Sequence, residues 1–196
     1  MTESADDILK RLGFTEKNIS SIVGRGKRNS PKTLQLIRET LTARADDLAA
    51  LMEATGFDAK SLSSMLHGAG AHIATGIEAL VANKDKLKGM VDAGTFDAKS
   101  LSSMLNGAGA HIAEAIDAIY TRQDKLNAIV RGGFAATEVA TRLHAVATSD
   151  LGAEIDALYT SLYPELNSNT VIPAGAEAQI VDGSPATLAA QQQVEK

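Results

Sequence analysis

Residues 57–74 read FDAKSLSSMLHGAGAHIA, and residues 96–113 read FDAKSLSSMLNGAGAHIA. The two stretches are identical at 17 of 18 positions and differ only at His67 and Asn106. This identity indicates an internal duplication. Repeat periods of this size are typical of stacked helical arrays, in which each unit buries its apolar face against its neighbours.

The phenylalanines extend the pattern beyond these twins. They are Phe14, Phe57, Phe96 and Phe134, spaced 43, 39 and 38 residues apart, and each is followed five and nine residues later by an aliphatic side chain. We therefore predict an α-helical repeat domain over residues 1–166, with four units starting near the four phenylalanines. Residues 167–196 contain two prolines and a glutamine run without a sustained apolar period, which predicts a flexible tail.

Local signals define one unit. Asp58 and Asp97 follow the phenylalanine directly and are expected to cap a short helix of about ten residues. The glycines of GAGAH end this helix, because glycine adopts the left-handed conformation of a C-cap without strain. The apolar face of residues 73–91 predicts a longer second helix.

The resulting fold class is all-α, a helical-repeat solenoid of about four helix-turn-helix units, each with a short helix, a glycine turn and a longer helix. One alternative stays open within a unit. The longer helix could be split into two near Asp85 and near Asp124, because the segments that precede the phenylalanines resemble one another.

Little in the sequence indicates catalysis. The chain has no cysteine, and its 33 alanines supply most of the small apolar residues. His72 and His111 occupy the same place in the twins and have no evident ligand partners, so we expect them to be structural. The glycine patterns GAGAH and GRGK lack the residue spacing of a phosphate-binding loop. We predict no enzyme activity, no cofactor and no metal site.

Charge is distributed unevenly along the chain. Residues 1–44 carry nine Lys and Arg against five Asp and Glu, whereas residues 45–196 carry ten against nineteen. The best basic feature is the cluster of Lys17, Arg25, Lys27, Arg28, Lys32 and Arg38. Of these, Arg25, Lys27, Arg28 and Lys32 lie at a glycine-rich turn where a helix restarts with Pro31. Because helix N-termini favour anions, these residues are candidates for contact with an anion or a nucleic acid.

The polar opening MTESADD predicts no secretory signal peptide, and no apolar stretch approaches the ~20 residues that cross a bilayer. We expect a soluble protein with no membrane partner, located in the cytoplasm or exported by a route that needs no N-terminal signal peptide.

The pattern of a short helix, a glycine turn, a longer helix and a closing glycine resembles TAL-effector-like DNA-binding repeats from Phe14 to about Tyr163. A generic α-solenoid is the alternative resemblance. The TAL-effector-like resemblance implies that the turn residues His67 and Asn106 contact a partner. The period of 38–43 residues departs from the ~34 residues of those families.

Two functions follow from these observations. The first is a non-enzymatic binding module with a protein partner. The alternative is a nucleic-acid-binding protein that contacts DNA through its basic N-terminal repeat and its inter-helix turns.

Overall fold

The computed structural model describes residues 3–24, 30–144 and 150–164, and within these ranges the chain is all-α, without a strand. The chain divides into a unit of Met1–Tyr163 and a unit of Pro164–Lys196. The first unit holds all the described helices. Apart from Pro164, the second unit lies outside the described residues, and so does the predicted tail 167–196.

The α-helices, in chain order, are α1 (Ala5–Arg11), α2 (Glu16–Val23), α3 (Pro31–Ala43), α4 (Ala45–Thr55), α5 (Ala59–Met65), α6 (Ile73–Ala82), α7 (Lys84–Asp92), α8 (Ala98–Met104), α9 (Ile112–Tyr120), α10 (Gln123–Arg131), α11 (Ala136–His144) and α12 (Leu151–Leu162). Two short 3-10 helices, η1 (Gly70–His72) and η2 (Gly109–His111), lead into α6 and α9.

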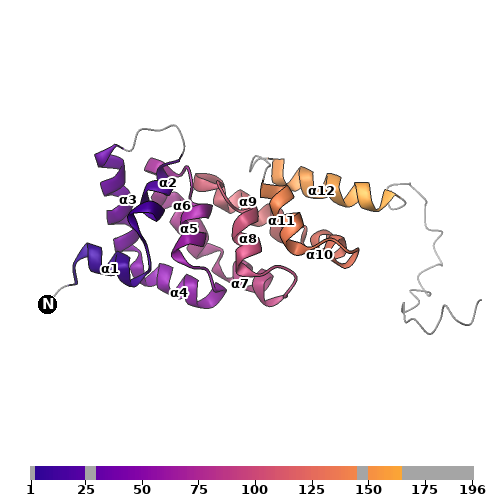
Figure 1. The fold of residues 1–196 in the computed structure, drawn as a ribbon, viewed down its shortest axis with the longest axis horizontal. Helices are drawn as coiled ribbons and strands as arrows, with labels where there is room; N and C mark the ends of the chain where they lie inside the picture. Colours follow the sequence, from indigo (N-terminus) through magenta and orange to yellow (C-terminus); the bar gives the residue numbers. More distant parts are fainter. Residues whose placement is uncertain (1–2, 25–29, 145–149, 165–196) are drawn as a thin grey trace, which may run out of the picture. The chain divides into compact units, whose positions relative to one another are not determined.

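The helices contact one another in chain order (Figure 1). The short helix α2 packs against α5, α5 against α8, and α8 against α11. Behind this row, α3 contacts α6, α6 contacts α9, and α9 contacts α12. Helices α4, α7 and α10 each contact the second helix after them, namely α6, α9 and α12. Segments 38 to 43 residues apart in the sequence therefore lie side by side.

The predicted longer helix is two helices at each place. Helix α6 ends before Asn83 and α7 begins after it, and α9 and α10 are separated by Thr121 and Arg122. The backbone of Asn83 leaves the helical region, at φ −100° and ψ 16°, and its side-chain amide donates a hydrogen bond of 2.9 Å to the carbonyl oxygen of Ala79. The apolar residues of segment 73–91 keep their helical spacing across this break. Their periodicity alone therefore does not reveal that the segment forms two helices.

The predicted caps are confirmed. The carboxylate of Asp58 accepts a hydrogen bond of 2.7 Å from the backbone N–H of Ser61, and Asp97 does the same with Ser100. Thr15 forms a capping box with Asn18 at the start of α2. These side chains satisfy amides that a helix N-terminus leaves without an intrahelical partner.

One hydrophobic core runs through the described helices. Phe14, Phe57 and Phe96 are buried in it, and Phe134 is half-buried against it. The aliphatic residue five positions after each phenylalanine is also buried: these residues are Ile19, Leu62, Leu101 and Val139. The spacing that marked the units in the sequence is thus the spacing of core positions.

Candidate binding surface on the short helices

Helices α2, α5 and α8 expose the same residue types at matching positions. The second residue of each is an exposed lysine, and the sixth is a half-buried serine. These residues are Lys17, Lys60 and Lys99, followed by Ser21, Ser64 and Ser103. We call them the lysine row and the serine row.

The sequence places these rows on the outside by helical periodicity. In α5 the buried side chains are those of Ala59, Leu62, Ser63 and Met65, which face the core. Lys60 and Ser64 lie four residues apart and therefore share one face of the helix. Because α5 and α8 have the same sequence, AKSLSSM, the same face recurs on α8.

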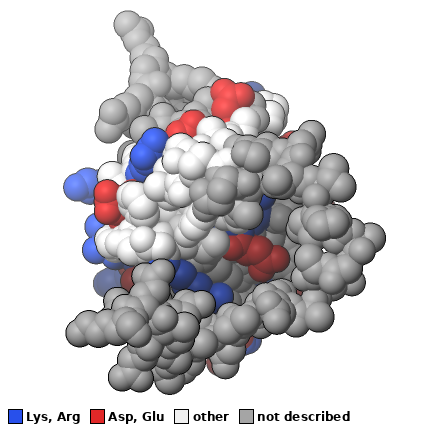
Figure 2. All heavy atoms as spheres, turned by 90° about the vertical axis from the view of Figure 1, so that its right-hand side faces the viewer, with Lys and Arg blue, Asp and Glu red and all other residues white. Residues whose placement is uncertain are grey.

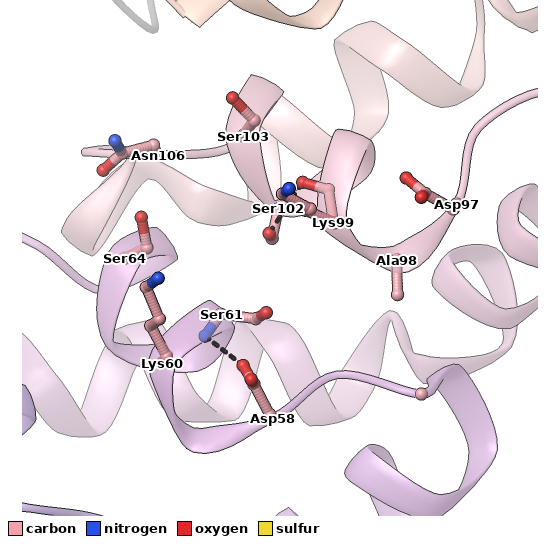
Figure 3. Close-up of a pocket in the computed structure, with 11 residues that line it drawn as sticks. Asp58, Lys60, Ser61, Ser64, Asp97, Ala98, Lys99, Ser102, Ser103 and Asn106 are labelled. Carbon is pink, nitrogen blue, oxygen red and sulfur yellow. Dashed lines mark hydrogen bonds between the residues drawn. The ribbon is translucent and has the colours of Figure 1, made fainter. Parts of the chain in front are cut away.

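Two open surface grooves lie along the contacts of α2 with α5 and of α5 with α8. The groove between α5 and α8 has a volume of about 500 Å³ and contains Lys60 and Lys99, with Ser64, Ser103 and Asn106 among its lining residues (Figure 3). A second groove between α2 and α5, of about 440 Å³, has Lys17 and Lys60 in its wall. Lys60, Ser64 and Asn106 line both grooves, which links them into one surface.

The lysine row forms no ion pair within the described residues, although Asp58 and Asp97 line the same groove as Lys60 and Lys99. None of its three ammonium groups has a described carboxylate within 4.0 Å. Figure 3 shows Lys60 reaching along α5 towards Ser64, whereas Asp58 turns to the backbone of Ser61.

The two carboxylates that line the groove between α5 and α8 each cap the N-terminus of their own helix. The hydrogen bond from the backbone N–H of Ser61 lowers the pKa of Asp58, with a smaller contribution from the charge of Lys60. Hydrogen bonds from Ser100 lower the pKa of Asp97 in the same way. Both carboxylates stay ionised at neutral pH as helix caps.

The structure brings two predicted contact residues to this surface. His67 lines the groove between α2 and α5, and Asn106 lines both grooves; each is half-buried. The side-chain nitrogen Nδ2 of Asn106 also lies 3.4 Å from Nε2 of His144, at the end of α11. These two turn residues therefore lie next to the lysine row.

The predicted basic cluster is only partly described. Arg25, Lys27 and Arg28 lie outside the described residues. Lys32 is exposed near the start of α3 and lines neither groove. Of the lysine row, the predicted basic cluster contained Lys17 alone. Lys60 and Lys99 were missed, although all three lysines follow a phenylalanine by three residues.

The glycine turns hold neighbouring helices together. The backbone N–H of Gly68 donates a hydrogen bond of 3.1 Å to the carbonyl oxygen of Ile22, and that of Gly107 donates one of 3.0 Å to Ser64. Gly68, Gly70, Gly107 and Gly109 all have positive φ angles, between +52° and +86°. These two amides therefore serve contacts between successive helices.

The other histidines lie apart from these grooves. His72 and His111 end η1 and η2 and are exposed, and Nδ1 of His111 lies 3.9 Å from Oε1 of Glu114. Within the described residues, no three His, Cys, Asp or Glu side chains come together as a metal site would require.

The rest of the described surface is polar and mixed in charge. Leu36 and Tyr120 are the large apolar side chains exposed in the described part of the chain. Seen from the C-terminal side of the helices, Lys and Arg side chains lie beside Asp and Glu side chains (Figure 2). Among the described helices, none has the length and hydropathy to cross a membrane.

Comparison with known proteins found no matching family model, no matching curated protein and no matching solved structure.

Proposed function

We propose that the chain is a non-enzymatic helical-repeat module that binds a protein partner through the lysine row and the grooves beside it. In this proposal the helices form a solenoid of four units, led by α2, α5, α8 and α11. The near-identical twins in the sequence and the chain-order contacts of the short helices support this arrangement.

One observation carries the proposal: three equivalent helices expose equivalent lysines, and no described carboxylate pairs with them. A repeated surface of this kind suits a ligand that runs across successive units, as the partners of repeat proteins do. A polar rim of serine and asparagine supplies donors and acceptors for the backbone of such a ligand.

A protein partner fits this surface better than a nucleic acid does. No aromatic side chain lines either groove to stack on a base.

The test is a selection of displayed random peptides on the full chain. The affinity of each selected peptide is then measured for a triple variant with Lys17→Gln, Lys60→Gln and Lys99→Gln. Peptides that bind the unmodified chain and lose at least tenfold in affinity on the triple variant support the proposal. A Lys88→Gln variant is the control, because Lys88 lies on α7 and lines neither groove. Peptides that bind all three proteins equally would place the binding surface elsewhere.

The alternative is DNA binding, as in TAL-effector-like proteins. It is favoured by the position of His67 and Asn106 in the same grooves as Lys60. Arg25, Lys27 and Arg28 would add phosphate contacts. A gel shift with duplex DNA at low salt tests this function, because counterion release makes phosphate binding strongest there. A shift that weakens steeply with salt and disappears in the triple lysine variant would replace the protein-binding proposal.

A further inference from the structure

The lysines of the row do not lie where a positive charge stabilises a helix. Each lysine is the second residue of its helix, where the helix dipole disfavours a positive charge. In α11 the same position is Thr137, so the row ends at Lys99. A ligand of the row therefore meets three cations, on α2, α5 and α8.

The spacing of the row limits the shape of that ligand. Packed helices lie about 8–10 Å apart, so we expect equivalent lysines on successive helices to repeat at about this distance. An extended peptide advances about 3.1–3.4 Å per residue, and three residues therefore span about 9–10 Å. One helix of the row corresponds to three residues of an extended ligand.

We propose that the lysine row binds an extended acidic peptide segment of a partner protein, with a carboxylate at every third residue. The minimal segment has seven residues, with Asp or Glu at its first, fourth and seventh positions, one for each lysine. This inference rests on the proposed protein-binding function and specifies the chemistry of the partner.

The surroundings of the row match such a segment. Ser64 and Asn106 lie beside Lys60 in both grooves and can hydrogen-bond the peptide backbone between two carboxylates. Asp58 and Asp97 also line the groove between α5 and α8, where each accepts a hydrogen bond from the backbone of its own helix. Because the other lining residues are lysines and polar or small side chains, the residues between the carboxylates of the peptide need not be apolar. Charge complementarity and spacing, rather than burial of a large side chain, would select the partner.

The experiment compares two labelled decapeptides of the same composition by fluorescence anisotropy and by NMR shifts of the ¹⁵N-labelled full chain, at low salt. One has glutamates at positions 2, 5 and 8 among serine and glycine; the other has them at positions 4, 5 and 6. We expect the spaced peptide to bind at least fivefold more tightly, with the largest shifts at Lys60, Ser64 and Asn106. Exposed ion pairs contribute up to about fivefold each, so Lys60→Gln should weaken the spaced peptide by two- to fivefold.

Two variants distinguish binding at the lysine row from non-specific binding and from loss of folding. Lys88→Gln should leave binding of the spaced peptide unchanged, and circular dichroism should show the same melting temperature for Lys60→Gln and the unmodified chain. Equal affinity of the two decapeptides, or no effect of Lys60→Gln, would overturn the inference.

The peptide selection distinguishes the inference from the function on which it rests. Lysine-dependent peptides without acidic residues at three-residue spacing would overturn the inference and leave the protein-binding function standing. Lysine-dependent binding of duplex DNA, with neither decapeptide bound, would overturn both. If neither a peptide nor DNA binds in a way that depends on the lysine row, both the inference and the protein-binding function are overturned.

Discussion

The backbone N–H of Gly107 donates a hydrogen bond of 3.0 Å to the carbonyl oxygen of Ser64, so the turn after α8 is fastened to the end of α5. Ser64 is also a lining residue of both grooves. The contact that sets the register of two short helices thus lies within the candidate binding surface. Changes to these turns should affect stability and ligand affinity together.

Gly109 is expected to be the least replaceable residue of its turn. A Cβ at Gly109 would lie 3.0 Å from the carbonyl oxygen of His67, whereas one at Gly107 would meet nothing within 4 Å. Both residues have positive φ angles, so an alanine is strained at either place, at a cost of about 1–2 kcal/mol. Gly109→Ala should therefore lower the free energy of unfolding by at least about 1 kcal/mol more than Gly107→Ala. Urea denaturation of the two variants measures the difference, and equal losses would contradict the close approach.

Two glycines inside helices should respond to alanine in opposite directions. At Gly76, in α6, a Cβ would lie 2.7 Å from Cδ2 of Leu66 and 3.0 Å from the carbonyl oxygen of Gly109. At Gly89, in α7, it would meet nothing within 4 Å. Gly89→Ala should stabilise the protein by about 0.5–1 kcal/mol through helix propensity, whereas Gly76→Ala should destabilise it despite the same gain. Thermal unfolding gives both signs, and stabilisation by Gly76→Ala would show that the neighbouring turn moves freely.

The phenylalanines should differ according to their burial. Phe57 is 3 % exposed, and its replacement by alanine removes a ring from the core at an expected cost of about 3–5 kcal/mol. Phe134 is only half-buried, so Phe134→Ala should cost less. Chemical denaturation of the two variants tests this order. A larger loss at Phe134 would mean that the fourth phenylalanine has a greater part in the core than its exposure indicates.

The two aspartate caps predict a stability change in acid. The pKa values of Asp58 and Asp97 are lowered in the folded chain, first of all by hydrogen bonds from Ser61 and Ser100. A lowered folded-state pKa means that the caps stabilise the fold above the unfolded pKa of about 4, and that this stabilisation is lost as the pH falls through the folded-state values.

A double variant isolates this effect. Asn caps a helix nearly as well as Asp but does not titrate. The melting temperature of Asp58→Asn, Asp97→Asn should therefore fall less between pH 7 and pH 3 than that of the unmodified chain. The other carboxylates titrate in both proteins and cancel in the comparison. An identical fall would exclude a contribution of the caps to acid sensitivity.

Local features of the fold were predictable because they depend on neighbouring residues. Asp58 caps α5, and Gly68 of the GAGAH turn adopts a positive φ angle as expected, since a cap or a left-handed turn needs only a suitable residue at the right place. The break at Asn83 was left open because the apolar stripe keeps its spacing on both sides of it.

The candidate surface was harder to predict because it depends on which helices are neighbours. His67 and Asn106 stood out as the one difference between the twins. The equivalence of Lys17, Lys60 and Lys99 is visible in the sequence, but their meeting along two grooves depends on the order in which α2, α5 and α8 pack.

The close approach at Gly76 has a consequence for how such a chain can grow by gene duplication. An extra copy of residues 57–95 inserted after Thr95 would again place a glycine of α6 against the incoming GAGAH turn. Insertion after Gly133 would instead bring that turn against Ala115, the counterpart of Gly76 in α9, which carries the methyl group that Gly76 lacks. Extension before Phe96 therefore adds no new steric conflict, and a single missing methyl group makes the two insertion points unequal.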